Sequence, residues 1–491
     1  MKMILGTETE FGIASNRADS SDPVSNSILL VNSYPHLPSS TTLWDYENEN
    51  PLLDARGFEA DGERERPGRD YNRLLNKLLP NGGRLYVDGA HPEYSTPECA
   101  SPLDLIAFEK VGERMMALAI EMTRPLKQGT VDLSVYKNNS DGKGNSYGYH
   151  ENYLVSRQLP FETLVSQLTP FLVTRQIFAG SGKVGAENRT EPAHYQISQR
   201  ADFFETLVDL NTMVKRPIIN TRDEPHADAK RYRRLHVIVG DTNMAEVATY
   251  LKVGTLALVL EMLEAGREVS GVDLDDPVRS IKDISRDLTL KKKIKLSRGT
   301  KWTAAQIQRA YLEEAEKHFS ESRDPVTLDL LGRWRTILAK LEEDPMQLTR
   351  ELDWVIKKEL IESYMSRKGC AWNDPRISMM NLQYHNVVQD KGLFFSLERG
   401  GYVERLASPE QIINAQENPP NDTRAYFRGA CLKKFSKEIY AASWSTILFD
   451  MGNANIKKVP LVDPWKGGKS LVGTLLEKAN SVEELLEMLT T

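Results

Sequence analysis

Residues 3–13 read Met3-Ile4-Leu5-Gly6-Thr7-Glu8-Thr9-Glu10-Phe11-Gly12-Ile13, and this pattern predicts one β-strand. Glu8 and Glu10 stand two residues apart, so both side chains project from one face of that strand. The apolar residues on either side favour a buried strand, and burial raises the cost of an unpaired charge. Two carboxylates that face the same way repel each other unless a cation lies between them. From this pair alone, a metal site and a solvent-facing strand both remain open.

A second stretch repeats this spacing. In Arg84-Leu85-Tyr86-Val87-Asp88, the side chains of Tyr86 and Asp88 share one face, and His91-Pro92-Glu93-Tyr94 adds Glu93 near the strand end. Sites rich in oxygen ligands suit Mg²⁺, which binds carboxylates together with phosphate oxygens. The alternative is that Asp88 caps a turn and that Glu93 is solvated.

Two histidines have suggestive settings. His150 lies in Tyr147-Gly148-Tyr149-His150-Glu151-Asn152, and His236 lies inside the apolar strand Leu235-His236-Val237-Ile238-Val239. Imidazole is a common metal ligand. A lone histidine in a strand is also commonly a hydrogen-bonded core residue, so both interpretations stay open.

The composition excludes several classes of protein. The 491 residues carry a formal net charge of -6, which gives no global electrostatic reason to bind nucleic acid or an anionic membrane. The three cysteines, Cys99, Cys370 and Cys431, lack the spacing of a disulfide framework or a zinc site. Glutamates occupy the place of a signal-peptide core, and no stretch reaches the ~18 uninterrupted apolar residues of a membrane span. We therefore expect a cytoplasmic protein.

The length predicts a large domain with at least one smaller one. Residues 14–83 are rich in Ser, Asn, Asp, Pro and Gly, which predicts loops, and Ser101-Pro102 predicts the start of a helix. Residues 251–263 predict a buried core helix that ends near Glu264 and is capped by Asn243. Further predicted elements are strands at 131–136 and 235–240, three helical segments between 303 and 364, and a small α+β module after about 419.

Two glycine-rich stretches look like phosphate-binding loops but fail the pattern. Asp463 replaces the first glycine required before Gly467-Gly468-Lys469-Ser470, and Ile177 and Val184 replace required residues around Gly180-Ser181-Gly182-Lys183. Any bound phosphate would therefore be neutralised by metals and arginines. The candidate arginines are Arg200, Arg222, Arg231, Arg233 and Arg234.

The order of these motifs resembles the glutamine synthetase superfamily: Glu8-Thr9-Glu10 comes first, then His91-Pro92-Glu93-Tyr94-Ser95-Thr96, then a turn that ends at His150. More specifically, stretches along nearly the whole chain resemble the Pup ligase and depupylase family. These stretches are Gly6-Thr7-Glu8-Thr9-Glu10-Phe11-Gly12, Tyr136-Lys137-Asn138-Asn139, His150-Glu151-Asn152-Tyr153-Leu154, Pro170-Phe171-Leu172-Val173-Thr174-Arg175-Gln176 and Ile219-Asn220-Thr221-Arg222-Asp223-Glu224-Pro225-His226-Ala227-Asp228.

Residues 44–58 favour the depupylase branch of this family. They read Trp44-Asp45-Tyr46-Glu47-Asn48-Glu49-Asn50-Pro51-Leu52-Leu53-Asp54-Ala55-Arg56-Gly57-Phe58 and lie in a much longer connection between the two carboxylate strands than the ligase has. Residues 418–429 and 442–444 also resemble the depupylase more than the ligase. Gly89 departs from the family, in which a histidine is expected after the catalytic aspartate. This departure concerns the fine tuning of the catalytic aspartate and does not affect the assignment to this class of enzyme.

The resemblance implies an α+β, glutamine-synthetase-like fold, in which a curved antiparallel sheet carries the active site and packs with helices. It implies a catalytic domain at 1–418, with a depupylase-type loop around 40–80, and a small C-terminal domain at 419–491. The implied activity is ATP- and Mg²⁺-dependent hydrolysis of the isopeptide bond between Pup and substrate lysines, with deamidation of the C-terminal glutamine of Pup. The implied partners are Pup and pupylated proteins.

Carried over residue by residue, the resemblance gives each candidate residue a role. Asp88 becomes the catalytic carboxylate, and Arg222 holds substrate carboxylate or developing oxyanion charge. A salt bridge with Asp223 or Asp228 is the alternative role for Arg222. The implied metal ligands are Glu8, Glu10, Tyr86, Glu93, His150 and His236. The implied nucleotide contacts are Arg200, Arg234, Arg424 and Arg428, with an ordinary surface role as the alternative for the last two.

Three other functions remain open at this stage: a Pup ligase, a γ-glutamyl ligase for a small molecule, and a non-catalytic scaffold that keeps the fold. The long connection at 44–58 argues against the ligase. The intact carboxylates Glu8, Glu10, Asp88 and Glu93 argue against the scaffold.

Overall fold

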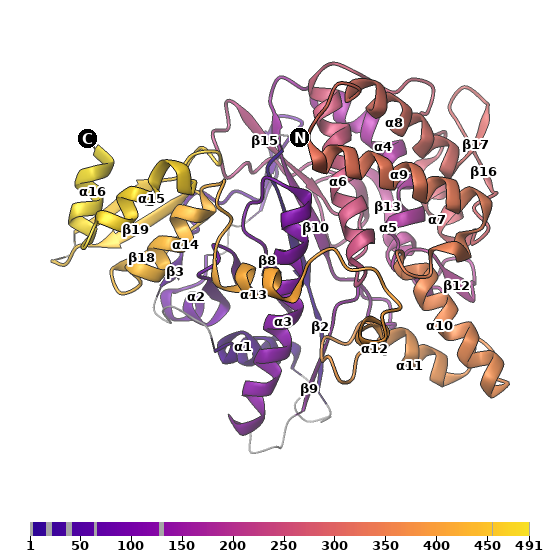
Figure 1. The fold of residues 1–491 in the computed structure, drawn as a ribbon, viewed down its shortest axis with the longest axis horizontal. Coiled ribbons are helices and arrows are strands. Elements are labelled where there is room, and N and C mark those ends of the chain that lie inside the picture. The colour runs from indigo at the N-terminus through magenta and orange to yellow at the C-terminus, as the bar shows by residue number, and fades with distance from the viewer. Residues whose placement is uncertain are drawn as a thin grey trace.

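Strand β1 (Leu5–Glu10) lies inside a six-stranded sheet with the order β15-β10-β1-β8-β7-β6 (Figure 1). The computed structural model describes residues 3–15, 22–35, 42–62, 66–126, 132–453 and 455–490. Every neighbouring pair in this sheet is antiparallel. The other five strands are β6 (Asn76–Leu78), β7 (Arg84–Asp88), β8 (His91–Ser95), β10 (Tyr149–Ser156) and β15 (Tyr232–Val237).

The single strand predicted for residues 3–13 is wrong in extent. β1 ends at Glu10, and β2 (Gly12–Ser15) pairs with β9 (Leu133–Tyr136) in a separate two-stranded sheet. The change occurs at Phe11, which is buried and whose N–H donates to the carbonyl of Pro92 at 2.9 Å. The chain therefore changes partner strand immediately after the second glutamate.

The remaining strands form a second sheet and several pairs. The second sheet has the order β20-β19-β18-β3, with β3 parallel to β18. Its strands are β3 (Leu43–Trp44), β18 (Ile439–Ala442), β19 (Thr446–Asp450) and β20 (Ile456–Pro460). The pairs are β4 (Leu53–Asp54) with β5 (Phe58–Glu59), β11 (Lys183–Val184) with β12 (Tyr195–Gln196), β13 (Phe204–Asp209) with β14 (Arg216–Asn220), and β16 (Lys293–Lys295) with β17 (Lys301–Thr303).

Helices cover the six-stranded sheet and extend the molecule to one side of it (Figure 1). Helix α3 (Pro102–Leu126) contacts β1, and α6 (Glu246–Glu264) contacts β10. The start of α3 confirms the prediction from Ser101-Pro102. The other helices are α1 (Pro23–Ser33), α2 (Arg69–Leu75), α4 (Phe161–Thr174), α5 (Gln176–Ala179), α7 (Pro277–Arg286), α8 (Ala304–His318), α9 (Pro325–Glu343), α10 (Asp353–Lys368), α11 (Pro375–Gln383), α12 (Leu393–Arg399), α13 (Pro409–Glu417), α14 (Ala425–Lys434), α15 (Lys469–Lys478) and α16 (Val482–Thr490), with short 3₁₀ turns η2 (Ala201–Phe203) and η3 (Pro345–Leu348).

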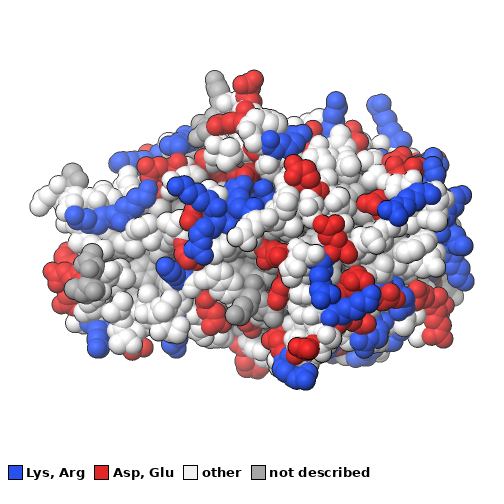
Figure 2. Space-filling view, turned by 90° about the horizontal axis from the view of Figure 1, so that it is seen from above, with Lys and Arg blue, Asp and Glu red and all other residues white. Residues whose placement is uncertain are grey.

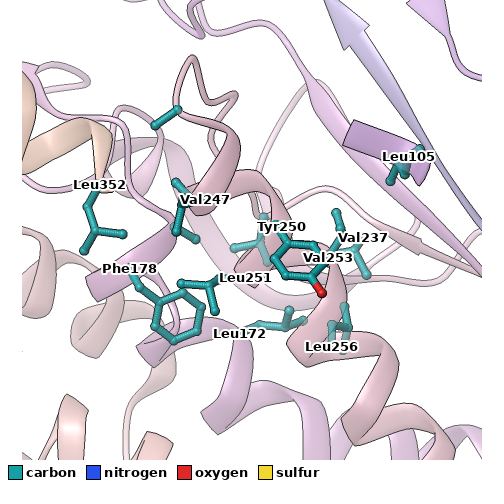
Figure 3. Close-up of a cluster of buried hydrophobic side chains, with 14 of the residues drawn as sticks. Leu105, Leu172, Phe178, Val237, Val247, Tyr250, Leu251, Val253, Leu256 and Leu352 are labelled. Carbon is teal, nitrogen blue, oxygen red and sulfur yellow. The ribbon is translucent and has the colours of Figure 1, made fainter. Parts of the chain in front are cut away.

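Helix α6 is the centre of the main core, and its burial confirms the core helix predicted from residues 251–263. Apolar side chains cover all its sides, which is typical of a fully buried helix, and Leu251, Val253 and Leu256 pack with residues of other elements (Figure 3). The predicted cap, Asn243, is wrong. Ala245 stands at the N-cap and makes no side-chain cap, while the carboxylate of Asp353 on α10 accepts the N–H groups of Met244 and Ala245, just before the helix, at 3.1 and 3.0 Å.

Residues 14–83 contain more helix than the predicted loops. Helix α1 begins after Asp22, whose carboxylate accepts the N–H groups of Val24 and Ser25 at 3.1 and 3.2 Å. Asp22-Pro23 is a typical start of a helix, with the cap followed by proline at the first helical position. The predicted division of residues 303–364 into three helical segments is confirmed by α8, α9 and α10.

The C-terminal elements surround a second, smaller core that includes Trp44 and Leu78 from the N-terminal part of the chain. Because β3 completes the sheet of β18 to β20, this module takes one strand from residues 43–44. The domain boundary at 418–419 stays a prediction. None of the helices in the described ranges combines the length and the apolar composition that a membrane span requires.

Glu98 joins the C-terminal elements to the six-stranded sheet domain. Its carboxylate accepts Arg424 Nε at 2.7 Å and also binds the guanidinium of Arg428. Burial alone would raise the pKa of Glu98, but the charges and hydrogen bonds of the two arginines lower it to about 2. Because this pKa lies below the usual value of 4.5, the contact stabilises the fold above pH 4.5. That contribution is lost as the pH falls towards 2.

We expect Glu98→Gln to lower the free energy of unfolding at pH 7 by about 3–5 kcal/mol, because two buried guanidinium groups lose their counter-charge. Urea unfolding at pH 7 and at pH 3 measures this, and the gap between variant and parent should narrow at pH 3. Glu342→Gln, which breaks a partly exposed pair with Arg309, is the control and should cost about 0–1 kcal/mol. Equal stability of Glu98→Gln and the parent at pH 7 would contradict the role of Glu98.

Candidate active site

The register of the sheet brings the predicted metal ligands to one face. Glu8 on β1 lies opposite His150 on β10, and Glu10 lies opposite Glu93 on β8. Tyr86 on β7 in turn lies opposite Glu93. Residues that face each other across an antiparallel pair project to the same side of the sheet. The two-residue spacing seen in the sequence therefore extends across four strands.

The first group of possible ligands is Glu8, His150 and His236, whose ligand atoms lie within 4.8 Å of one another. His150 Nδ1 lies 3.2 Å from Glu8 Oε2. Asn152 links the group, because its Nδ2 donates to Glu8 Oε1 at 3.1 Å and its Oδ1 lies 3.0 Å from His236 Nδ1. Burial would raise the pKa of Glu8, but the hydrogen bond of His150 and the charges of His236 and Arg234 hold it well below 4.5. The first group therefore contains an ionised carboxylate at Glu8.

The second group is Glu10, Asp88 and Glu93, whose carboxylate oxygens also lie within 4.8 Å of one another. Burial, and then repulsion by Asp88 and Glu10, raise the pKa of Glu93 well above 4.5. Desolvation of its carboxyl group and the charge of Glu10 also raise the pKa of Asp88. The residue as a whole is exposed at the end of β7. Three carboxylates in this arrangement are unfavourable without cations.

Gly148 shows how closely the two groups approach each other. A Cβ atom at this position would lie 2.5 Å from His150 Nε2 and 2.6 Å from Glu10 Oε1, so any larger residue would displace a ligand from each group. The sequence analysis quoted Gly148 in a motif but gave it no role. Its requirement for glycine is steric and appears only in the structure.

The donor atoms fit divalent cations. Two buried atoms, His236 Nε2 and Glu93 Oε2, have no hydrogen-bond partner among the described residues, and each belongs to one of the two groups. Such atoms are costly unless a ligand satisfies them. The second group offers only oxygen, which suits Mg²⁺, whereas the first group adds imidazole nitrogen.

Four arginines near the second group have no ion pair with a carboxylate among the residues that the structure describes: Arg84, Arg200, Arg216 and Arg222. Arg200 Nε donates to Ser146 Oγ at 3.3 Å and Arg216 Nη2 to Ser146 O at 2.6 Å, so one turn holds both side chains. Burial, and then the charge of Arg216, lower the pKa of Arg200 to about 10. Two close guanidinium groups with little counter-charge favour an anionic ligand.

Arg222 lies on the chain segment that the 44–58 insert contacts. Its backbone forms a bridge with Asp54, and its Nε is buried without a partner. Asp223 is bound through both oxygens by Arg157, at 2.6 and 2.9 Å, so the structure does not contain the alternative Arg222 to Asp223 salt bridge. Of the predicted loop around 40–80, residues 40, 41 and 63–65 lie outside the described residues.

Two of the other predicted nucleotide contacts, Arg234 and Arg424, line a cavity of about 80 Å³ next to the first group. Arg234 lines it, donates to Asn152 Oδ1 at 2.8 Å and lies 3.6 Å from Glu8 Oε1. Arg424 also lines the cavity, although its Nε is held by Glu98. Arg428 is 1 % exposed, and its donors go to Glu98 and to the carbonyls of Gly82 and Trp444. A nucleotide contact by Arg428 would require these bonds to rearrange.

Arg216 and Asn152 are also parts of the site, although neither was predicted from the sequence. Asn152 stands two residues after His150, so the spacing that selected Glu8 and Glu10 also selects it. Arg216 is the first residue of β14, and only the folded structure brings it to the site. The residues around it in the sequence show no two-residue spacing of possible ligands.

Residues 3–448 match the family model described as Pup-ligase protein. The depupylase of Acidothermus cellulolyticus is 46% identical, over 100% of this chain and 99% of the relative. The Pup deamidase/depupylase of Mycolicibacterium smegmatis is 45% identical over 100% of both chains.

Two solved structures share the fold. The Pup ligase PafA in its crystal complex with the prokaryotic ubiquitin-like protein Pup has a TM-score of 0.80 and 34% identity, over 99% of this chain and 97% of the other. PafA in complex with ADP has a TM-score of 0.75 and 37% identity, over 86% and 96%. These similarities confirm the α+β, glutamine-synthetase-like fold class. Since the family model covers most of the chain and the curated relatives align over all of it, the chain belongs to the Pup ligase family.

Proposed function

We propose that this chain is a depupylase that hydrolyses the isopeptide bond between Pup and substrate lysines and deamidates the C-terminal glutamine of Pup. The observation that carries the proposal is the full-length similarity, at 45–46% identity, to relatives named depupylase and Pup deamidase/depupylase. The ligase is less supported, because relatives named Pup–protein ligase reach the same 45–46% identity over only 73% of this chain, whereas those named depupylase align over 100% of it. The enzyme would therefore be a hydrolase that acts on carbon-nitrogen bonds.

The cofactors in this proposal are ATP and Mg²⁺. The cavity beside Glu8, Arg234 and Arg424 combines a possible metal ligand with two guanidinium groups, which suits an anionic ligand. The ADP found with PafA, at 37% identity, supports a nucleotide here. Glu8, Glu10, Tyr86, Glu93, His150 and His236 would hold the cations. When bound, Mg²⁺ would neutralise phosphate charge and polarise a carbonyl oxygen.

Asp88 is the reacting carboxylate in this mechanism. It stands at the exposed end of β7, and its carboxylate lies close to those of Glu10 and Glu93 in the second group. It either attacks the amide carbon, so that the amine leaves with a proton from solvent and water then hydrolyses the resulting anhydride, or it takes a proton from the attacking water and gives it to the leaving amine. Both substrates are carboxamides at the same carbon of Pup, so one carboxylate can serve both reactions.

The arginines near the second group stabilise negative charge. Arg222 holds the substrate carboxylate or the developing oxyanion, and Arg200 and Arg216 support it because neither has an ion-pair partner in the described ranges. A guanidinium can bind such an oxyanion through two donors. The buried Arg222 Nε without a partner supports this assignment.

The partners in this proposal are Pup and pupylated proteins, and the location is the cytoplasm. PafA, a relative with the same fold, forms a complex with Pup. Lys and Arg gather near the middle of one face of the molecule (Figure 2), although the whole chain carries a charge of -6. A local basic surface of this kind suits an acidic polypeptide.

We expect Asp88→Asn to keep ATP and Pup binding but to lose depupylation and deamidation together, by at least about 10²–10⁴-fold, since the amide lacks the reacting lone pair. Release of a substrate from pupylated protein and conversion of glutamine to glutamate in Pup are the two assays. Asp329→Asn, on the distant α9, is the control and should match the parent. Parental cleavage by Asp88→Asn would remove this role, and a parent that joins Pup to lysine but cannot release it would be a ligase.

The metal assignment makes a separate prediction. ATP binding should require Mg²⁺ and should weaken by at least about 10-fold in Glu10→Ala, because the cation loses a carboxylate ligand. Calorimetry with Mg²⁺ and with EDTA measures this, and Glu343→Ala at the end of α9 is the control. Equal ATP affinity under both conditions would exclude a metal-dependent nucleotide site.

A further inference from the structure

Arg84 joins the 44–58 insert to the second carboxylate group. Its Cζ lies 3.9 Å from the ring centroid of Trp44 and 3.9 Å from that of Tyr86. Two rings cannot occupy the same side of one planar group at this distance, so the guanidinium lies between them. Arg84 is 8 % exposed and Trp44 is 2 % exposed, so the stack is shielded from water. Cation–π attraction is strongest in such surroundings.

The edge of the guanidinium is bound by neutral groups. Arg84 Nε donates to Asn76 Oδ1 at 3.0 Å, and Nη2 lies 3.4 Å from the hydroxyl of Tyr46. The faces of the two rings therefore contact the positive charge directly, and the carboxylates of Glu49 and Asp88 interact with it without forming an ion pair in the described ranges. This differs from Arg175 in the core, which is bound through two donors by the carboxylate of Glu151.

Each ring is also fixed at its far end. Trp44 Nε1 donates to Glu49 Oε1 at 2.6 Å. Tyr86 stands directly opposite Glu93 across β7 and β8, and its hydroxyl lies 3.4 Å from Ser95 Oγ. The position of the Tyr86 ring thus determines where its hydroxyl and the Glu93 carboxylate stand. A continuous series of contacts leads from Glu49 in the insert to the second carboxylate group.

We propose that Arg84 is a positioning residue for the divalent cation: clamped between Trp44 and Tyr86, it fixes the Tyr86 hydroxyl and the Glu93 carboxylate at the distance the cation needs. This inference rests on the metal site of the proposed function. It also gives the insert a physical link to catalysis, because Trp44 supplies one side of the clamp. Lysine is a point charge without a planar face, so it replaces Arg84 only in part.

The test measures binding of Mn²⁺ alone, from the electron paramagnetic resonance of the free ion. Arg84→Met keeps an unbranched side chain but removes the charge and the donors, and should raise the Mn²⁺ dissociation constant by about 10–100-fold, the usual effect of losing a partner of a metal ligand. Arg84→Lys should recover part of the affinity. Trp44→Leu should behave like Arg84→Met, whereas Trp44→Phe keeps a ring face and should stay closer to the parent.

Arg233→Met is the matched control. Arg233 is also buried and lies 5.3 Å from the ring of Phe161, but it projects from the other face of β15. Its loss should lower the melting temperature without changing Mn²⁺ affinity. If Arg84→Met and Trp44→Leu melt at lower temperature yet bind Mn²⁺ as the parent does, Arg84 is only structural and the inference is wrong. A parent that binds no Mn²⁺ would instead refute the metal site itself, and the role of Arg84 with it.

Discussion

The register between β1 and β10 is the constraint on which the rest of the site depends. With Glu8 opposite His150, one face of the strand pair presents carboxylates, imidazole and amide, and the other presents Thr7 and Tyr149 to the core. A slip by one residue would exchange the two faces, since side chains alternate along a strand. The carboxylates would then point into the core, and the metal site would be lost together with the fold.

Polar contacts on the reverse face hold this register. Arg175 binds Glu151 on β10 through two donors, at 2.9 and 2.5 Å, and the hydroxyl of Tyr149 donates to Glu109 on α3 at 2.8 Å. Lys137 in turn donates to Glu109 at 3.0 Å. Any other register would leave these buried charges unpaired, at a cost of several kcal/mol for each broken pair. Apolar packing alone would give a smaller difference in free energy between the correct register and a shifted one.

The sequence predicted the parts of the site that follow from local spacing. The two-residue repeat identified Glu8, Glu10, Tyr86 and Asp88 because strand geometry alone places such residues on one face. It could not show that two histidines approach the same face, and the family resemblance supplied that expectation. Arg216 was not predicted, because the pairing of β13 with β14 places it near the site and no local sequence pattern indicates this pairing.

The errors in the fold have the same physical origin. Asn243 has the right chemistry for a helix cap, but Asp353, far along the chain, brings a full negative charge to that helix end. Helix α1 is a different case, because Asp22-Pro23 is a local signal that the polar composition of the region obscured. Composition describes a segment as a whole, whereas a cap depends on two or three residues.

The two halves of the site are charged differently, and this decides how they respond to a cation. In the first half, His150, His236 and Arg234 already stabilise the negative charge of Glu8 and keep its pKa low. The second half lacks such stabilisation, because desolvation and the repulsion between carboxylates raise the pKa of Glu93 and of Asp88. A cation near Glu10 and Glu93 would lower both pKa values and so favour the ionised carboxylates. Metal binding in the second half would therefore relieve the repulsion around Asp88 and keep its carboxylate ionised for the proposed reaction.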